Sequence, residues 1–258
     1  MAIVKCLVLT TCLLQLSICF AGQVIRLTNG EWEPFLSEKL PKFGPSSQVV
    51  TEVFARLGIT VSYDFFPWPR AYENARIGRW NGSVIWIKNN ERAKFFYFSD
   101  PILVLPKYLY HLSTKEYEWT TVHDLKGLVI GVTYSYTYGM ELDKALETGL
   151  VKASWVTSDL IGLKKLLSGR VDLVPLEPQV LQSLLKNNFS KAEKEKISFH
   201  EKPVTIAAYR LMLNKDNPDH FQLIEAFNRE LNQLKKSGRV EKIYKAILGD
   251  MYTSSFVD

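Results

Sequence analysis

The chain has 258 residues, and its 32 lysine and arginine residues exceed its 27 aspartate and glutamate residues by five formal charges. This net positive charge is small, and the charged residues of both signs are interspersed along the chain. We therefore expect no nucleic-acid partner. All three cysteines lie in the first 19 residues, and no two of the four histidines are spaced four residues apart. We therefore expect no disulfide, no metal site and no cofactor.

Residues 1–21 are typical of a secretory signal peptide. Lys5 is their only charged residue, an apolar run extends over Cys6–Leu16, and Cys19-Phe20-Ala21 precedes Gly22 as a cleavage site. Polar residues interrupt the apolar run, whereas a membrane anchor needs about 20 consecutive apolar residues. We therefore expect an exported, soluble protein.

The first half of the chain after this segment alternates strands with helices. The predicted order is a strand at 23–29, a helix at 45–57, a strand at 59–66, a short helix from 67 to 78 and a strand at 82–87. This order is typical of a mostly parallel sheet with helices on its faces. Trp32 and Phe35 occupy the loop after the first strand, where they either face a ligand crevice or cover the sheet edge.

The second half repeats this alternation between two long apolar strands at 102–112 and 203–213. The elements between them are a strand at 128–133, a helix at 139–147, a short strand at 155–156, a helix at 159–167, a strand at 171–176 and a helix from 178. A long amphipathic helix from 217 and a last helix at 240–248 follow. The order indicates two α/β lobes, residues 22–105 with 206–258 and residues 106–205, joined by two crossings with a cleft between them.

Arg92 is the first candidate binding residue. It lies between a polar turn at Asn89–Glu91 and an aromatic run at Phe95–Phe98. A guanidinium held near strand ends can bind a carboxylate through two parallel hydrogen bonds, which a lysine cannot do. The other interpretation is a surface arginine that caps a loop.

The segments Glu91-Arg92-Ala93-Lys94 and Phe98-Ser99-Asp100-Pro101 resemble the signature of the family 3 extracellular solute-binding proteins, the periplasmic receptors of polar amino-acid ABC importers. The resemblance extends over roughly residues 24–249, although its motifs are short. It implies a type II periplasmic binding protein fold, an α/β fold of two lobes around a cleft. It also implies a monomer in the periplasm that serves an ABC permease of the inner membrane.

In the resembled family the arginine at the position of Arg92 binds the carboxylate of the ligand. Ser135, Tyr136 and Thr137 stand where the family has a Gly-Thr-Thr turn, whose amides and hydroxyl support that carboxylate at a helix N-terminus. Glu177 stands where the family has an acid, usually Asp, that binds the ligand's ammonium. The alternatives are an ordinary strand-to-helix turn at 135–137 and an acid at 177 that merely favours the start of the next helix.

The sequence departs from the family at several of these positions. Ser135 replaces the glycine and Tyr136 a threonine, and Ile85 and Ile87 replace hydroxyl residues, so that only Asn89 keeps a hydrogen-bonding side chain before the arginine. A drier and more aromatic pocket is expected. The candidate ligand-binding residues are Arg92, Asn89, Thr137, Ser135, Glu177, Trp32, Phe35, Trp68, Trp86 and Tyr136.

The function that these residues favour is capture of an amino acid or small carboxylate between two lobes for import, with no catalytic residue. One alternative is an enzyme on the same fold, similar to periplasmic cyclohexadienyl dehydratases, with Glu177 as a general acid. The other is a ligand-sensing module for a membrane partner.

Overall fold

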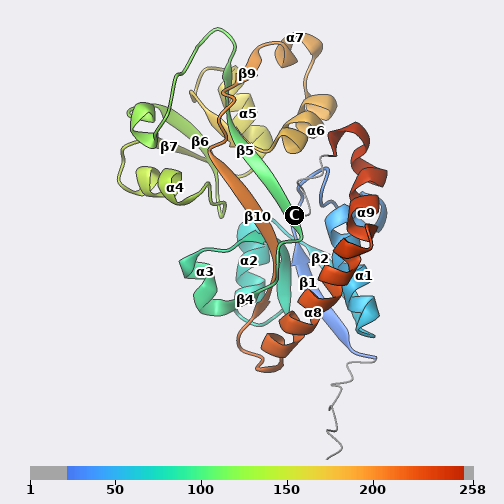
Figure 1. The fold of residues 1–258 in the computed structure, drawn as a ribbon. Helices are drawn as coiled ribbons and strands as arrows, with labels where there is room; N and C mark the ends of the chain where they lie inside the picture. The colour runs from blue at the N-terminus through green and yellow to red at the C-terminus, as the bar shows by residue number, and fades with distance from the viewer. Residues whose placement is uncertain (1–21, 253–258) are drawn as a thin grey trace, which may run out of the picture.

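The computed structural model describes residues 22–252, so the predicted signal peptide at 1–21 lies outside the described part of the chain. Two α/β lobes lie one above the other, and two long strands, β5 (Leu103–Leu112) and β10 (Thr205–Asn214), run between them side by side (Figure 1). The predicted two-lobed α/β architecture is therefore confirmed.

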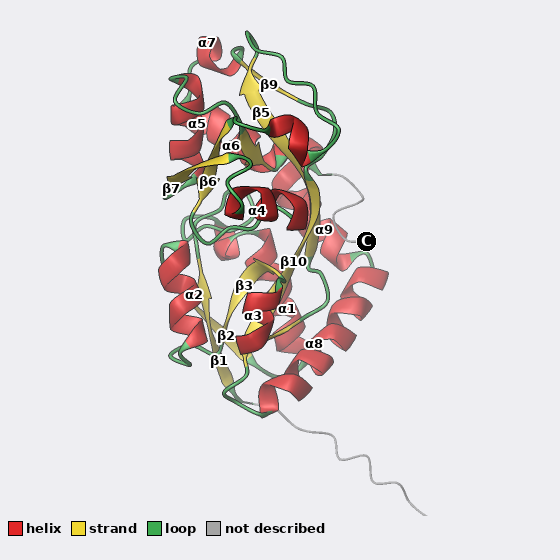
Figure 2. Cartoon of the chain, turned by 90° about the vertical axis from the view of Figure 1, so that its left-hand side faces the viewer, coloured by secondary structure: helices red, strands yellow, loops and turns green. Residues whose placement is uncertain are grey.

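Lobe 1 is built on three parallel strands. β1 (Val24–Asn29) pairs with both β2 (Thr60–Phe65) and β3 (Gly82–Ile87). Helix α2 (Trp68–Arg76) lies on one side of these strands, and α1 (Pro45–Arg56) lies on the other with α8 (Figure 2). Helix α1 packs into the core through Val49, Val50, Val53 and Phe54, none of which has any exposed surface.

The C-terminal helices α8 (Asp219–Lys236) and α9 (Arg239–Leu248) return to lobe 1. Phe227 of α8 packs against Phe54 of α1 with ring centroids 5.1 Å apart. The hydroxyl groups of Tyr244 on α9 and Ser46 on α1 lie 2.9 Å apart in the buried interface. The end of the chain therefore completes the lobe that its beginning started.

The two crossing strands join the lobes in one sheet, with the order β2-β1-β3-β10-β5-β8. They are antiparallel to each other, with Thr205 opposite Lys107 and Tyr209 opposite Leu103. β10 also pairs with β3 and β4 (Phe96–Phe98), whereas β5 also pairs with β8 (Val174–Leu176) and β9 (Ile197–Phe199). The predicted lobe limits, 105/106 and 205/206, fall within β5 and β10. The exact limits of the lobes remain a prediction.

Lobe 2 has a second, parallel pair of strands with helices around it. β6 (Val129–Thr133) pairs with β7 (Lys152–Val156). Its core includes Leu109, Ile130, Val132, Leu142 and Leu173, each at most 1% exposed. The helices of this lobe are α4 (Met140–Glu147), α5 (Asp159–Leu167), α6 (Pro178–Asn188) and the single turn α7 (Lys191–Lys194).

The local structure differs from the prediction in a few short segments. The polar turn expected around Arg92 is a helix, α3 (Asn90–Phe95), and the following run forms β4. The strand expected at 171–176 is shortened to β8, because Leu173 makes only a single bridge to Ile130. The short α7 and β9 and the 3₁₀ segments η1 (Pro41–Phe43), η2 (Val122–Leu125) and η3 (Gly249–Met251) were not predicted, since segments this short carry no readable periodicity.

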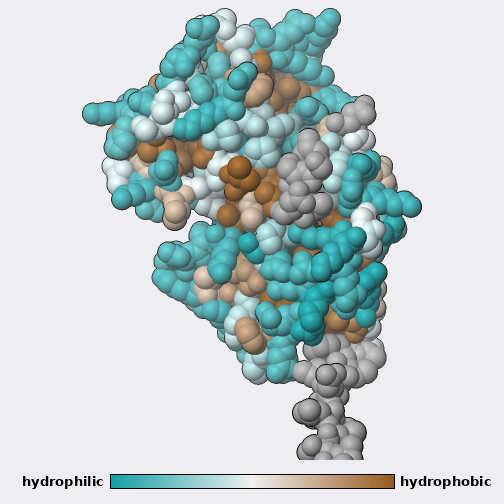
Figure 3. Space-filling model, in the orientation of Figure 1, coloured by the Kyte–Doolittle hydropathy of each residue, from teal (hydrophilic) through white to brown (hydrophobic). Residues whose placement is uncertain are grey.

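Hydrophilic residues cover most of the visible surface of both lobes, and hydrophobic residues gather at the waist between them (Figure 3). Ile206 of β10, with 68% of its surface exposed, is one of the large apolar residues on the outside. Among residues 22–252, no helix combines the length and apolar character that a membrane crossing requires.

Replacing Gly82 should separate the strands that hold the crossing to lobe 1. A Cβ on Gly82 would lie 2.0 Å from the carbonyl oxygen of Met212 on β10, and backbone cannot yield as a flexible side chain can. We expect Gly82→Ala to lower the free energy of unfolding in urea by about 3 kcal/mol or more. In the control Gly162→Ala, the new methyl group would meet Val174 at an ordinary 3.5 Å inside a helix, so stability should be unchanged or slightly higher. Equal stability of the two variants would contradict the prediction.

Candidate functional site

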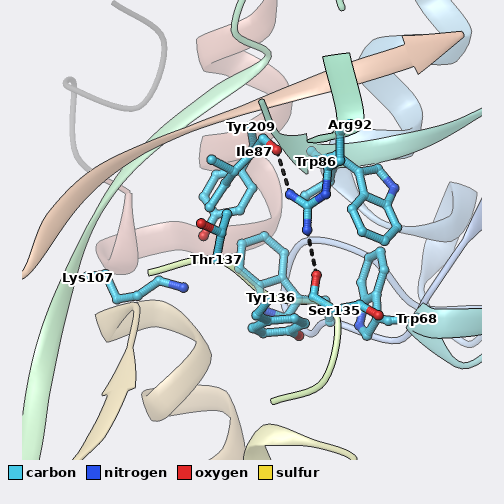
Figure 4. A pocket seen from close by; sticks show the side chains of 11 residues that line it. Trp68, Trp86, Ile87, Arg92, Lys107, Ser135, Tyr136, Thr137 and Tyr209 are labelled. Carbon is cyan, nitrogen blue, oxygen red and sulfur yellow. Dashed lines mark hydrogen bonds between the residues drawn. The ribbon is translucent and has the colours of Figure 1, made fainter. Parts of the chain in front are cut away.

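A small pocket lies where the two lobes meet (Figure 4). It holds about 30 Å³ for the centres of water molecules, which is room for two or three of them. Lobe 1, the two crossing strands and one turn of lobe 2 all contribute side chains. The lining residues are Trp32, Trp68, Ile85, Trp86, Ile87, Arg92, Lys107, Ser135, Tyr136, Thr137 and Tyr209.

Helix α3 delivers Arg92 to this pocket. The side-chain oxygen of Asn89 accepts a hydrogen bond of 2.9 Å from the Arg92 amide, so Asn89 caps the helix. Only 7% of the surface of Arg92 is exposed, which rules out a surface loop arginine. One terminal nitrogen donates to the carbonyl of Ile87 in lobe 1 and the other to the carbonyl of Ser135 in lobe 2, each at 2.6 Å (Figure 4). Arg92 therefore bridges the lobes.

The surroundings of Arg92 are apolar as well as buried. Its guanidinium carbon lies 4.8 Å from the ring centroid of Trp86, a cation–π contact. Burial lowers the pKa of Arg92 to about 10, so it remains charged at neutral pH. A charge in this position, with two of its five N–H donors on backbone carbonyls, offers the other donors to an anion.

Aromatic rings form most of the pocket wall. Trp68 meets Trp86 edge to face at 5.4 Å and reaches across the cleft to Tyr136 at 6.3 Å. Trp32 contacts Tyr209 at 4.8 Å between ring centroids. A Cβ on Gly30 would lie 2.6 Å from the Trp68 ring, so the glycine allows the indole to lie flat on the backbone. Trp32, Trp68 and Tyr136 also line a larger adjoining pocket of about 620 Å³.

The turn at residues 135–137 reaches the pocket from lobe 2. Ser135 has φ of +67°, a left-handed conformation that glycine adopts at no steric cost, so the backbone keeps the shape of a glycine turn although the residue is serine. The Thr137 hydroxyl donates to Asp143, which also accepts the Tyr138 amide at 2.8 Å. The Thr137 hydroxyl, which was expected to face a ligand, is thus bound by an acid of helix α4.

A buried ion pair lies behind the pocket. Lys107 Nζ lies 3.1 Å from Oε1 of Glu177, and their side chains are 2% and 1% exposed. The Tyr209 hydroxyl donates to the same carboxylate oxygen, and Oε2 of Glu177 has no hydrogen-bond partner within residues 22–252. The ammonium of Lys107 also lies 4.7 Å from the ring centroid of Tyr138 and 5.5 Å from that of Tyr136. Glu177 is therefore already paired with a cation of its own chain.

A second buried carboxylate, Asp159, opens helix α5 beside this pair. It accepts hydrogen bonds from the Thr133 hydroxyl at 2.9 Å and the Tyr136 hydroxyl at 3.3 Å. Burial raises the pKa of Asp159 to about 6, and the charge of nearby Glu177 adds to the effect. Asp159 positions the Tyr136 ring that closes the pocket.

The sequence matches the model of a known protein family. The family model of bacterial extracellular solute-binding proteins, family 3, matches residues 28–250. The chain is a family 3 solute-binding protein. No curated protein matches the chain.

Several solved structures share the fold of this solute-binding protein, which confirms the type II periplasmic binding protein architecture. A histidine kinase sensor domain with similarity to periplasmic binding proteins has a TM-score of 0.73 and 14% identity, covering 88% of this chain and 96% of the other. A putative L-cystine ABC transporter protein from Listeria monocytogenes has a TM-score of 0.72 and 21% identity, covering 91% and 99%. An ancestral arginine-binding protein bound to arginine has a TM-score of 0.71 and 21% identity, covering 88% and 98%.

Seven of the ten predicted ligand-binding residues of this solute-binding protein line the pocket. The other three do not: Asn89 caps α3, Glu177 lies behind Lys107 and Tyr209, and Phe35 supports Trp32 at 4.9 Å with no exposed surface. The seven are Trp32, Trp68, Trp86, Arg92, Ser135, Tyr136 and Thr137.

Sequence reasoning missed Lys107 and Tyr209, both on the crossing strands, as well as Asp159. Lys107 carried a usable signal, since it is the only charged side chain between Pro101 and His111 in an otherwise apolar stretch. A lone lysine in such a strand, where the strand passes a cleft, is costly to bury without a partner. Tyr209 and Asp159 carried no comparable signal.

The raised pKa of Asp159 makes stability depend on pH. Because the folded state holds this proton more tightly than the unfolded state, the group's contribution to stability falls as pH rises from about 4 to about 6. Asp159→Asn removes the titration, so the variant should gain roughly 2–3 kcal/mol on the wild type between pH 4 and 7. Urea unfolding of both proteins across this range measures the difference.

Asp172→Asn is a control of opposite sign. Hydrogen bonds from the Val129 amide and Lys115 hold the pKa of Asp172 below its ordinary value, so that variant should lose stability relative to the wild type as pH rises. Parallel pH profiles for the wild type and Asp159→Asn would contradict the assignment.

Proposed function

We propose that this protein captures a small solute with a carboxylate, an amino acid or a related carboxylate, between its lobes in the periplasm and delivers it to an ABC permease of the inner membrane. The observation that carries the proposal is the buried guanidinium of Arg92 in the pocket between the lobes. A buried cation that holds only neutral carbonyls favours an anion as a further partner. No chemical step is required.

Binding acts through the balance between open and closed arrangements of the lobes. A solute that contacts both lobes binds the closed arrangement better and therefore raises its population. Arg92 holds backbone of both lobes, and Trp68 of lobe 1 meets Tyr136 of lobe 2, so a solute in the pocket touches both sides. The closed form, as a monomer, is the form that the permease would receive.

A second candidate role is to sense the solute for a membrane partner. It is supported by the likeness to a histidine kinase sensor domain. The same pocket would serve, and the two roles differ only in the partner that the closed form contacts. Catalysis is the weaker candidate, because the proposed acid, Glu177, already has one oxygen bound by Lys107 and Tyr209.

Thermal unfolding against a solute panel tests the proposal. The panel contains amino acids, other small carboxylates, amines and sugars. A solute that binds only the folded protein adds about 2.7 kcal/mol of stability at a hundredfold excess over its dissociation constant, and the unfolding midpoint rises accordingly. We expect a carboxylate to produce this rise in the wild type and Arg92→Ala to abolish it.

Arg210→Ala is the matched control for Arg92. Arg210 is also partly buried and donates to a backbone carbonyl, that of Ser99 at 2.6 Å, but it lies outside the lining of the pocket. Its variant should keep the full rise with the same solute. A full response of Arg92→Ala would remove Arg92 from the site, and a response to sugars or amines alone would overturn the proposal.

A further inference from the structure

The pocket faces its ligand with positive charge and hydrogen-bond donors. Of the lining residues, Arg92 and Lys107 are cations and none is a carboxylate. The ammonium of Lys107 points toward the pocket from the crossing strand β5 (Figure 4). The indole N–H groups of Trp32 and Trp68 are buried and have no partner among the described residues. Both indoles line the pocket, and an indole N–H can only donate.

Two buried carboxylates beside the pocket already have partners in the chain. Glu177 holds Lys107 and Tyr209 through Oε1, and Asp159 holds Thr133 and Tyr136. Oε2 of Glu177 has no partner in the part of the chain that the structure describes, but Glu177 is fully buried and is not a lining residue. A ligand group reaches that oxygen only if Lys107 or Tyr209 moves.

The ammonium of Lys107 already occupies the place beside Glu177 where the ammonium of a ligand would be stabilised. The acid Glu177 and the faces of Tyr136 and Tyr138 surround Lys107 Nζ, the combination of charge and rings that binds ammonium groups. A ligand ammonium in this pocket would be a third cation beside Arg92 and Lys107, and none of the residues that line the pocket is an acid that could receive it. Burying an unpaired charge next to like charges is strongly unfavourable.

From these observations we infer that the ligand is a carboxylate without an α-ammonium group, in the class of the 2-oxo acids. The inference deepens the proposed function and rests on it. The carboxylate binds between Arg92 and Lys107, and the oxo oxygen accepts from an indole N–H. The rings of Trp32, Trp68 and Tyr136 also line the adjoining pocket of about 620 Å³, and they favour a flat apolar remainder there. The protein's own lysine thus takes the position that the amino group of an amino acid would need.

Matched pairs of solutes that differ only in this group test the inference. The pairs are phenylpyruvate with L-phenylalanine, 2-oxoglutarate with L-glutamate, and pyruvate with L-alanine, each titrated calorimetrically into the wild-type protein. In the pair that binds, we expect the oxo acid to bind at least about tenfold more tightly than the amino acid. A tenfold difference is the smallest effect expected when the amino acid leaves one buried charge or donor unsatisfied. The aromatic walls favour the first pair.

Variants of Lys107 test whether this side chain sets the preference. Lys107→Met leaves Glu177 free for a ligand ammonium, so the preference should move toward the amino acid. Should that variant fail to fold, Lys107→Met/Glu177→Gln leaves no unpaired charge and should bring the two affinities of a pair close together. Lys202→Met is the control, since its ammonium also lies over a ring, 4.5 Å from the centroid of Trp119, away from the pocket.

The outcomes separate this inference from the proposed function. Tighter binding of the amino acid in the wild type would overturn the inference and leave carboxylate capture in place. An unchanged preference in the Lys107 variants would also overturn it. Binding of neither member of any pair, with a response to a solute that has no carboxylate, would overturn the proposed function and the inference together.

Discussion

The antiparallel pairing of β5 with β10 is the interaction on which the rest of the structure depends. Each strand belongs to the sheet of one lobe and is paired with the strand that belongs to the other, so five residue pairs from Leu103 to Lys107 hold the lobes in one sheet. The same two strands pass the pocket and bring Lys107 and Tyr209 to it. The same two strands therefore connect the lobes and supply side chains to the site.

The buried pair of Lys107 and Glu177 is better explained by recognition than by stability. Removing two charges from water costs several kcal/mol for each, and a well-packed apolar pair of the same volume is often as stable or more so. The cost is reduced here by the Tyr209 hydroxyl and by the ring of Tyr138. What the pair provides is an ammonium held at one point in a buried, aromatic pocket, where its interaction with an anion would be weakly screened.

The sequence predicted the regular elements well, because long periodic segments with clear ends need no tertiary information. The helix Asp159–Leu167 was predicted to the residue, since Ser158 caps it and Gly169 follows it. Arg92 was found from its motif, and the aromatic wall from its composition. The partners of these residues could not be predicted: the carbonyl that Arg92 binds in lobe 2 is 43 positions away, and Lys107 and Glu177 are 70 positions apart. Local sequence patterns do not show which distant residues pair with each other. In the sequence alone, a capping role for Asn89 also cannot be distinguished from a ligand contact.

The two cations of the pocket are held by different lobes. Arg92 is carried by α3 in lobe 1, whereas Lys107 is tied to Glu177 and, through its neighbour Tyr108, to β8 of lobe 2. Two like charges therefore face the same pocket from the two lobes. Under the proposed function, an anion between them would turn their repulsion into two attractions, and the charge of the ligand would be the counterion that lets the two halves approach.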